Sequence, residues 1–168
     1  MPDPTRLDIH KRLTALLETI TTANGFQHDM AGKVFRGRGV YGDETPLPML
    51  SILEAPIPDE PPAQPGSGTE QKIRQQLVIQ GFVEDDRINP TDPAQVLLAE
   101  TKSVLAVERS KVDWNKPEDG ILGLGRTVTD LYIGAGVVRP ADEISDKAYF
   151  WLNLTLEFVE DLADPFGQ

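Results

Sequence analysis

The sequence predicts an α+β fold, with a single, mostly antiparallel sheet of four or five strands and two helices packed on one face of it. Three stretches lead to this prediction. Residues 72–83 alternate between polar and apolar side chains, which is the period of a half-buried strand. Residues 92–109 follow with apolar side chains at helical spacing. Residues 148–158 then alternate again, over a length that is long for a strand. Because no internal repeat or domain boundary is visible, we expect one domain over residues 1–168.

The N-terminal region predicts the first helix. Thr5 and Asp8 stand at the spacing of a capping box, although the second position is usually Glu or Gln. Asn24 and Gly25 form a good C-terminal stop. Between these signals an apolar stripe recurs at helical spacing, and it favours a surface that faces the core over one that binds a partner. The stripe consists of Ile9, Leu13, Leu16, Leu17 and Ile20.

Short strands and one long connection are expected before the long central strand. Residues 34–36 read as a short strand, and Pro46 and Pro48 delay the next one, so residues 49–53 should form a strand that is short or lies at a sheet edge. Residues 54–70 are rich in proline and contain no basic residue, which predicts a flexible or extended loop. This loop is either a tolerated surface insertion or an arm that orders on a neighbouring subunit. The strands on its two sides are expected to pair.

The helix over residues 92–109 has a clear N-terminal signal. Asp92 offers a carboxylate to the free N–H groups of the helix, and Pro93 suits the first helical position, where its missing N–H costs nothing. The apolar stripe of this helix is expected to fold back over the apolar face of the long strand. It consists of Ala94, Leu97, Leu98, Thr101 and Leu105.

Two more strands are expected after this helix, and they should pair with each other at the centre of the sheet. Residues 127–138 are strand-like, and Gly134 and Gly136 leave one side bare, which indicates a bulge or the close approach of a neighbour. The other side carries Thr129, Leu131, Ile133, Ala135 and Val137. In the last strand the inward residues are Ala148, Phe150, Leu152, Leu154, Leu156 and Phe158, and the outward residues are Tyr149, Trp151, Asn153, Thr155 and Glu157.

The composition argues against several classes of protein. The chain has 27 acidic and 16 basic residues and a formal net charge of -11. Nucleic-acid binding and docking on anionic lipid both need an excess of Lys and Arg. The absence of cysteine leaves no disulfide, thiolate nucleophile or zinc–thiolate site. No apolar run is long enough to span a membrane and the N-terminus lacks a signal pattern, so we expect a soluble protein that acts inside a cell or in a particle assembled there.

A search for catalytic, cofactor and metal motifs predicts no enzyme. Residues 120–127 match the spacing of a P-loop with Arg in place of Lys, but a loop precedes them and a strand-like segment follows, which favours an ordinary glycine-rich loop. His10 and His28 stand in different segments, so they predict no histidine cluster. The paired acidic residues lie in loops or at strand ends, where solvated charge explains them. We therefore predict no catalytic residue, no cofactor and no bound metal.

Two groups of side chains are candidates for contact with a partner. Tyr132, Tyr149 and Trp151 make one outward face of the C-terminal strands amphipathic, and this face is covered either by a loop of the same chain or by another protein. Arg36 and Arg38, together with Lys33, form the one short basic patch in an acidic sequence. This patch is either an electrostatic docking site for the acidic loops of a neighbour or a set of scattered, solvated charges.

One family resemblance arises from the centre of the chain. Residues 77–83 (Leu-Val-Ile-Gln-Gly-Phe-Val), then residues 89–96 (Asn-Pro-Thr-Asp-Pro-Ala-Gln-Val) and a helix, resemble the tail-terminator (tail-completion) proteins of long-tailed bacteriophages. Those proteins share the order helix, short strands, long strand, helix and paired C-terminal strands. The resemblance covers residues 5–160. It depends on the order of the elements and on their general residue pattern, not on a catalytic motif.

The resemblance implies a structural virion component at the head-proximal end of the tail, assembled in the host cytoplasm. It implies a homo-hexameric ring that caps the tail tube, stops its polymerisation and offers a surface to the head–tail connector or neck protein. The expected partners are the ring itself, the tail tube protein and the connector, with DNA only as cargo in the lumen and with no membrane. The alternatives are a neck or tail-tube protein of the same particle, or a small ligand-binding α+β domain.

Overall fold

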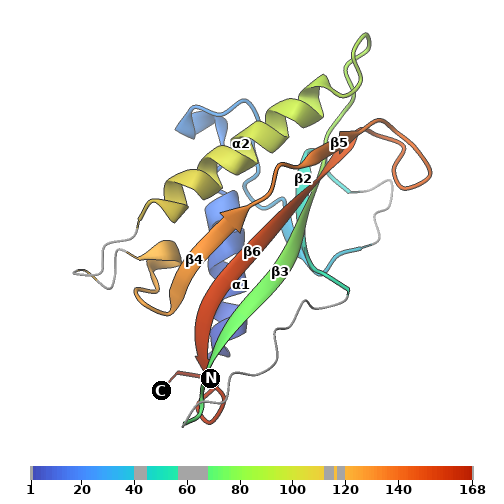
Figure 1. Cartoon of the computed structure of the whole chain (residues 1–168). Helices are drawn as coiled ribbons and strands as arrows, with labels where there is room; N and C mark the ends of the chain where they lie inside the picture. Colours follow the sequence, from blue (N-terminus) through green and yellow to red (C-terminus); the bar gives the residue numbers. More distant parts are fainter. Residues whose placement is uncertain (1, 40–44, 57–67, 112–115, 117–119, 168) are drawn as a thin grey trace.

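The computed structural model describes residues 2–39, 45–56, 68–111, 116 and 120–167 (Figure 1). In these residues two α-helices pack on a six-stranded mixed sheet, which confirms the predicted α+β class. The helices are α1 (Thr5–Leu17) and α2 (Asp92–Arg109), with short 3₁₀ turns at η1 (Thr22–Asn24) and η3 (Ile121–Gly123). The strands are β1 (Val34–Arg36), β2 (Met49–Glu54), β3 (Glu70–Phe82), β4 (Val128–Ile133), β5 (Val137–Arg139) and β6 (Tyr149–Asp161).

The centre of the sheet is the antiparallel pair of β3 and β6. These strands pair along their whole length, from Glu70 opposite Asp161 to Phe82 opposite Tyr149. The strand order is β1-β2-β3-β6-β4, and β5 also pairs with β6. The two long alternating stretches of the sequence therefore become neighbours (Figure 1). Their apolar sides together form one side of the core.

The short N-terminal strands complete the other side of the sheet. The antiparallel pairing of β2 with β3 confirms that the strands on both sides of the proline-rich loop pair, while residues 57–67 of that loop lie outside the described residues. The edge position considered for β2 is wrong, because β1 pairs with it in parallel, Val34 opposite Leu50. This parallel pair is also why the sheet is mixed.

The predicted strand over residues 127–138 is two strands. Ile133 lies opposite Leu154 and Val137 lies opposite Trp151, so three residues of this segment face two of β6. The backbone N–H of Gly134 donates to the carbonyl of Asn153 at 2.8 Å, and a Cβ on Gly134 would lie 2.9 Å from that oxygen. The predicted close approach at this glycine is thus confirmed, and the neighbour belongs to the same chain.

The predicted inward set of this segment is partly wrong. Leu131 is buried and Ile133 packs against the core, as expected. Ala135 and Val137 are exposed, because the extra residue between β4 and β5 reverses the alternation. A second register shift, between Val128 and Asp130, buries Val128 instead of Thr129. The predicted inward residues of β6 are all fully buried: Ala148, Phe150, Leu152, Leu154, Leu156 and Phe158.

Both helices contribute to a single core on one face of the sheet. In the view of Figure 1, α1 passes behind the strands of the sheet. The predicted stripes are confirmed, apart from Leu16, which is only partly buried. Burial of each large apolar side chain stabilises the fold by roughly 1.5–3 kcal/mol. The buried residues are Ile9, Leu13, Thr14 and Leu17 of α1 and Ala94, Leu97, Leu98, Glu100, Thr101, Val104, Leu105 and Glu108 of α2.

The predicted helix ends need correction. The N-cap of α1 is Pro4, no side chain caps this end, and Asp8 instead pairs with Arg12 one turn later, at 3.0 Å. The helix also ends at Leu17, so that Gly25, with φ +88°, terminates the separate turn η1. In α2 the N-cap is Thr91, without a side-chain bond, and Asp92 is already the first helical residue. These differences do not change the packed faces.

Candidate functional site

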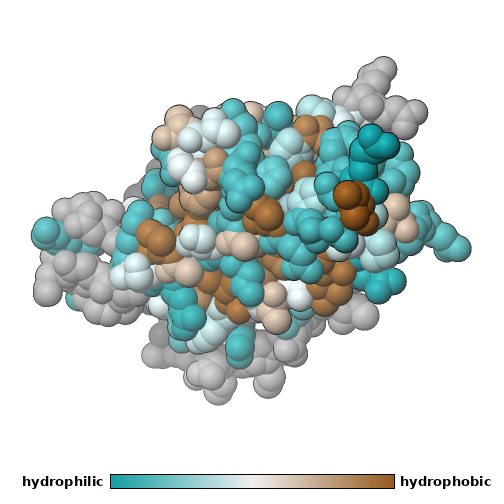
Figure 2. Space-filling model, turned by 90° about the horizontal axis from the view of Figure 1, so that it is seen from above, coloured by the Kyte–Doolittle hydropathy of each residue, from teal (hydrophilic) through white to brown (hydrophobic). Residues whose placement is uncertain are grey.

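One face of the molecule is chemically mixed (Figure 2). Seen from above, hydrophobic and hydrophilic residues are interspersed over the face in Figure 2. In the part of the chain that the structure describes, no group of three His, Asp or Glu side chains is arranged to hold a metal. His10 Nε2 lies 3.0 Å from Gln75 Oε1, and His28 Nδ1 lies 2.7 Å from Glu100 Oε2, so each histidine belongs to a different packing contact.

A small aromatic cluster lies on the sheet face opposite the helices. The ring of Tyr149 stacks on Phe82 at 5.9 Å and meets the edge of Trp151 at 5.6 Å. Tyr149 is only 1% exposed, and its hydroxyl donates to Asp142 Oδ2 at 2.7 Å from the β5–β6 loop. This face was expected to be covered either by a loop of the same chain or by another protein, and at Tyr149 a loop of the same chain covers it. The cluster consists of Met49, Phe82 and Tyr149, with Phe35, Leu47 and Trp151 packed around it.

The hydrogen bond between Tyr149 and Asp142 changes the acidity of both groups. Burial, and then the bond to the carboxylate, raise the pKa of the Tyr149 hydroxyl. The same bond, helped by the backbone N–H of Ile144, lowers the pKa of Asp142. Trp151 is half-buried, and its Nε1 is buried without a hydrogen-bond partner in the described structure. Tyr149 is therefore an anchor for a loop, and it does not present its ring to a partner.

Tyr132 is the accessible aromatic residue of the predicted set. It is 38% exposed, and the guanidinium carbons of Arg74 and Arg109 lie 5.3 Å and 5.7 Å from the centre of its ring. A hydrogen bond to Asp130, more than burial, raises the pKa of its hydroxyl. Its hydroxyl also lies 3.5 Å from Glu157 Oε2. Tyr and Arg are both enriched among the residues that contribute most to the binding energy of protein interfaces.

An uncharged band separates Tyr132 from the aromatic cluster on this open sheet face. The band consists of two neighbouring rows of residues that lie side by side across the strands. One row is Leu53, Val78 and Asn153, and in the next row Gln76 and Thr155 lie beside Tyr132. These residues alternate with the buried ones, so they point away from the helices. No charged residue belongs to either row, although 26% of the chain is charged. Such a band can contact another protein without removing charges from water.

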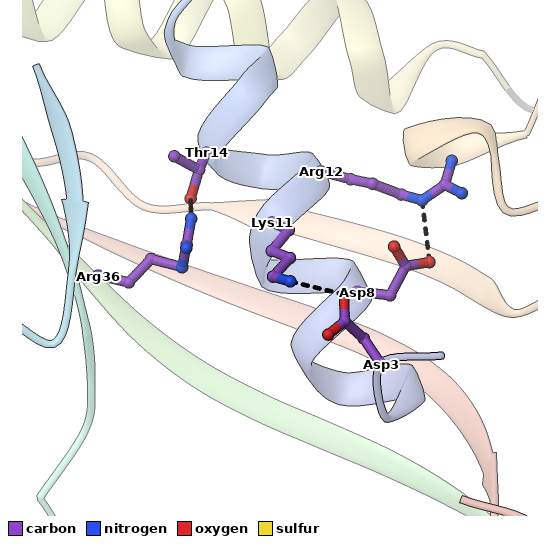
Figure 3. A network of polar contacts seen from close by, with 6 residues as sticks. All are labelled: Asp3, Asp8, Lys11, Arg12, Thr14 and Arg36. Carbon is purple, nitrogen blue, oxygen red and sulfur yellow. Dashed lines mark hydrogen bonds and ion pairs between the residues drawn. The ribbon is translucent and has the colours of Figure 1, made fainter. Parts of the chain in front are cut away.

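The predicted basic patch lies at and beyond the edge strand β1, and we call Lys33, Arg36 and Arg38 the basic edge. Arg36 reaches across to α1, where its Nη1 donates to Thr14 Oγ1 at 2.9 Å (Figure 3). Arg38 lies 4.6 Å above the ring of Phe35 and donates to Thr45 Oγ1 at 3.2 Å. The structure thus brings Arg38 of the basic edge next to the aromatic cluster, because Phe35, under Arg38, packs against that cluster.

Two buried carboxylates on α2 were missed by the sequence analysis. Glu100 is 8% exposed and accepts bonds from His28 Nδ1 and from the backbone N–H of Gln27. Glu108 is 5% exposed, accepts from the N–H of Leu122 at 2.7 Å and pairs with Lys111 at 2.9 Å. Each carboxylate fastens a loop to the helix. Both carboxylates lie beside the apolar stripe, about two helical turns apart, and this pattern could have predicted that they are buried.

The glycine-rich segment 120–127 is an ordinary loop, as the sequence favoured, and not a P-loop. It forms the 3₁₀ turn η3, in which Ile121 and Leu122 are buried, and the strand β4 follows. A Cβ on Gly120 would lie 2.5 Å from the carbonyl oxygen of Gly125, which explains one of the glycines. No helix N-terminus follows to receive a phosphate, so the described geometry is not that of a P-loop.

A scan against protein-family models finds no match, and a search of curated proteins finds no significant match. Among the described helices, none combines the length and apolar character needed to cross a membrane.

Proposed function

We propose that this protein is a tail terminator of a long-tailed bacteriophage, which acts as a structural part of the virion and not as an enzyme. The observation that carries the proposal is the order of the elements. A helix, two short strands, a long strand, a second helix and paired C-terminal strands follow one another along the chain. The resemblance in residues 77–83 and 89–96 falls at the junction of β3 and α2, within this order.

A terminator must bind the end of a tube and must also prevent the next ring from adding. This task needs two unlike surfaces and no chemistry. The sheet supports the task because one of its faces carries both helices, while the other carries the uncharged band and Tyr132. In the proposed hexameric ring, one surface contacts the tail tube protein and another contacts the connector or neck protein. The net charge of -11 suits a lumen through which DNA slides, because like charges do not adhere.

Electron microscopy of the purified protein, alone and mixed with isolated tail tubes of the parent particle, tests this function. We expect rings, and we expect density at one end of each tube. Tubes that grow without a length limit when the protein is omitted would support a terminator over a neck protein. If the protein stays monomeric and decorates no tube end, the proposal is wrong.

A further inference from the structure

The first half of β3 has one backbone edge that no described strand covers. β3 pairs with β6 over its whole length, but β2 pairs with it only at residues 77–82 (Figure 1). The last bond beyond this pairing runs from the N–H of Ala55 to the carbonyl of Gln76 at 3.1 Å. In the part of the chain that the structure describes, no strand lies beside residues 70–75 on this side.

The backbone groups of every second residue point toward this uncovered edge. In an antiparallel ladder the N–H and C=O of one residue point to the same side, and successive residues alternate between the two sides. The carbonyl of Thr69 bonds to the β6 side, where it accepts the N–H of Leu162 at 2.9 Å, whereas the carbonyl of Gln76 bonds to the β2 side. The residues whose N–H and C=O face the uncovered edge are therefore Glu70, Lys72 and Arg74, and all three are exposed.

The two outer edges of the sheet are shorter or partly closed. The edge strand β1 has three residues. On β4 the N–H of Leu131 faces away from β6, and Asp130 Oδ1 accepts it at 2.7 Å. The register shift between Val128 and Asp130 also interrupts this edge. Irregularities and side-chain bonds of this kind hinder the addition of another strand, so the first half of β3 is the edge best suited to one.

The side chains along this part of β3 are charged on the face away from the helices. The guanidinium of Arg74 lies over the ring of Tyr132, and in the described structure no carboxylate forms an ion pair with it. Lys72 Nζ lies 3.8 Å from Glu157 Oε2, and its side chain is 61% exposed. Ile73, between these two residues, packs against the core on the helix side.

This arrangement defines the segment that fits the edge. Opposite charges on directly opposed residues of two strands stabilise the pair, and like charges destabilise it. A strand that adds antiparallel, as β2 and β6 do, therefore needs acidic residues opposite Arg74 and Lys72 and a basic residue opposite Glu70. The residue between its two acidic ones lies beside Ile73 and should be apolar.

We propose that residues 70–74 of β3 are a strand-addition site for an extended acidic segment of another protein, with the pattern acidic–apolar–acidic–polar–basic. Main-chain hydrogen bonds to the uncovered edge supply the affinity, and the alternate side chains supply the selectivity. The inference goes beyond the proposed function and does not depend on it.

A second copy of the same strand fits this edge less well than the acidic segment. An antiparallel register that pairs Glu70 with Arg74 sets one Lys72 against the other, which is unfavourable. The register that pairs Glu70 with Lys72 leaves Arg74 opposite Gly68, without a charged partner. The charge pattern therefore favours a different protein as the occupant.

Amide hydrogen exchange of the full chain, followed by NMR, tests the site. The probe is the peptide acetyl-Thr-Glu-Val-Glu-Thr-Lys-Thr-amide, and the matched control is the reversed sequence, acetyl-Thr-Lys-Thr-Glu-Val-Glu-Thr-amide. In the free protein the amides of Lys72 and Arg74 should exchange fast, while that of Ile73, which faces β6, should exchange slowly. The probe should slow exchange at Lys72 and Arg74 by about tenfold or more, and the control should bind about tenfold more weakly.

Three results would overturn the proposal. Slow exchange at Lys72 and Arg74 in the free protein would mean that the edge is already occupied, by a second copy if the rates depend on protein concentration and by residues 57–67 of the same chain if they do not. Equal binding of the two peptides would mean charge attraction without strand addition. No slowing at millimolar probe would mean that the edge accepts no such segment.

Two pairs of variants separate the backbone from the charge. Lys72→Pro removes an N–H that faces the edge and leaves the bonds to β6, whereas Lys72→Ala removes only the charge, so the proline variant should bind the probe about tenfold more weakly than the alanine variant. Arg74→Glu should weaken binding by about tenfold, and Arg87→Glu, an exposed position after β3, should not. Thermal unfolding of each variant checks that the fold is kept. Equal binding within both pairs would overturn the assignment of this edge.

Discussion

Glu100 Oε2 lies 2.7 Å from His28 Nδ1, and this contact joins the middle of α2 to the loop that follows α1. Both side chains are largely buried, and the other oxygen of Glu100 accepts from the backbone of Gln27. A buried carboxylate is retained only where hydrogen bonds replace its hydration. The contact therefore couples the position of a long, irregular segment to the central helix.

Removing this carboxylate should destabilise the protein strongly. Glu100→Ala leaves His28 and the N–H of Gln27 without their acceptor, and we expect a loss of about 3 kcal/mol in the free energy of unfolding. Glu100→Gln keeps one acceptor and should lose roughly half as much. Urea denaturation measures both, with the exposed Gln95→Ala on the same helix as a control. Equal stability of Glu100→Ala and the control would show that the contact contributes nothing.

A methyl group should not be tolerated at Gly81. A Cβ there would lie 2.1 Å from Cε1 of Phe150, the residue opposite Gly81 on β6. Gly81→Ala should therefore cost roughly 1–3 kcal/mol or more, because a fully buried ring must shift within a packed core. Gly39→Ala is the control, since a Cβ at that position meets no atom within 4 Å. Guanidinium denaturation of both variants should separate them clearly.

Truncation in the core should show that α2 and β6 carry much of the stability. Leu97 and Leu154 are both 0% exposed, so each change to Ala should cost roughly 2–5 kcal/mol by lost burial and a residual cavity. A domain of this size has only about 5–15 kcal/mol of stability. Val107→Ala, at a 60% exposed position of α2, should change the free energy of unfolding by less than about 0.5 kcal/mol. Near-zero effects at both leucines would mean that the buried faces are assigned wrongly.

Acid should weaken the turn at Asp142. Its bonds from Tyr149 and Ile144 hold its pKa below the ordinary value of 3.8. A group whose pKa is lower in the folded protein adds stability above its unfolded pKa, and that stability is lost as the pH falls through the folded pKa. The stability of the wild-type protein should therefore fall below about pH 4 more steeply than that of Asp142→Asn.

Denaturation curves between about pH 6 and about pH 2 measure this difference. The control is Glu143→Gln, an exposed neighbour whose pH profile should follow that of the wild-type protein. Asp86 and Asp161, whose pKa values are also lowered by hydrogen bonds, remain in every variant and set the common background. Parallel profiles for wild type and Asp142→Asn would contradict the assigned role of this carboxylate.

The long elements could be predicted because local periodicity decides them. In residues 72–83 and 148–158 apolar side chains recur at every second position with few exceptions, and this apolar side of both stretches meets the same core. Gly134 and Gly136 indicated where the strand over residues 127–138 is irregular, but the reversal of its faces could not be predicted, because the contacts of Gly134 with Asn153 and of Gly136 with Leu98 arise only from the tertiary structure. One extra residue there reverses the face of Val137.

The candidate contact residues were predicted less well, for a related reason. Periodicity shows that Tyr149 and Tyr132 point away from the helices, but it does not show what covers them. Asp142, seven residues before Tyr149, closes a loop over one tyrosine, whereas the other remains exposed between two arginines. Likewise, a carboxylate beside an apolar stripe, such as Glu100, is identified as buried only when its loop partners are placed.

The central position of β6 has a consequence for synthesis of the protein. This strand pairs with β3 on one edge and with β4 and β5 on the other, and it is the last strand along the chain. Until residues 149–161 have emerged from the ribosome, β3 has an open edge and β4 and β5 have no strand to pair with. An exposed edge of this length invites pairing with other nascent chains. Rapid completion of translation through β6 should therefore protect the yield of folded protein, and a pause just before Tyr149 should favour aggregation.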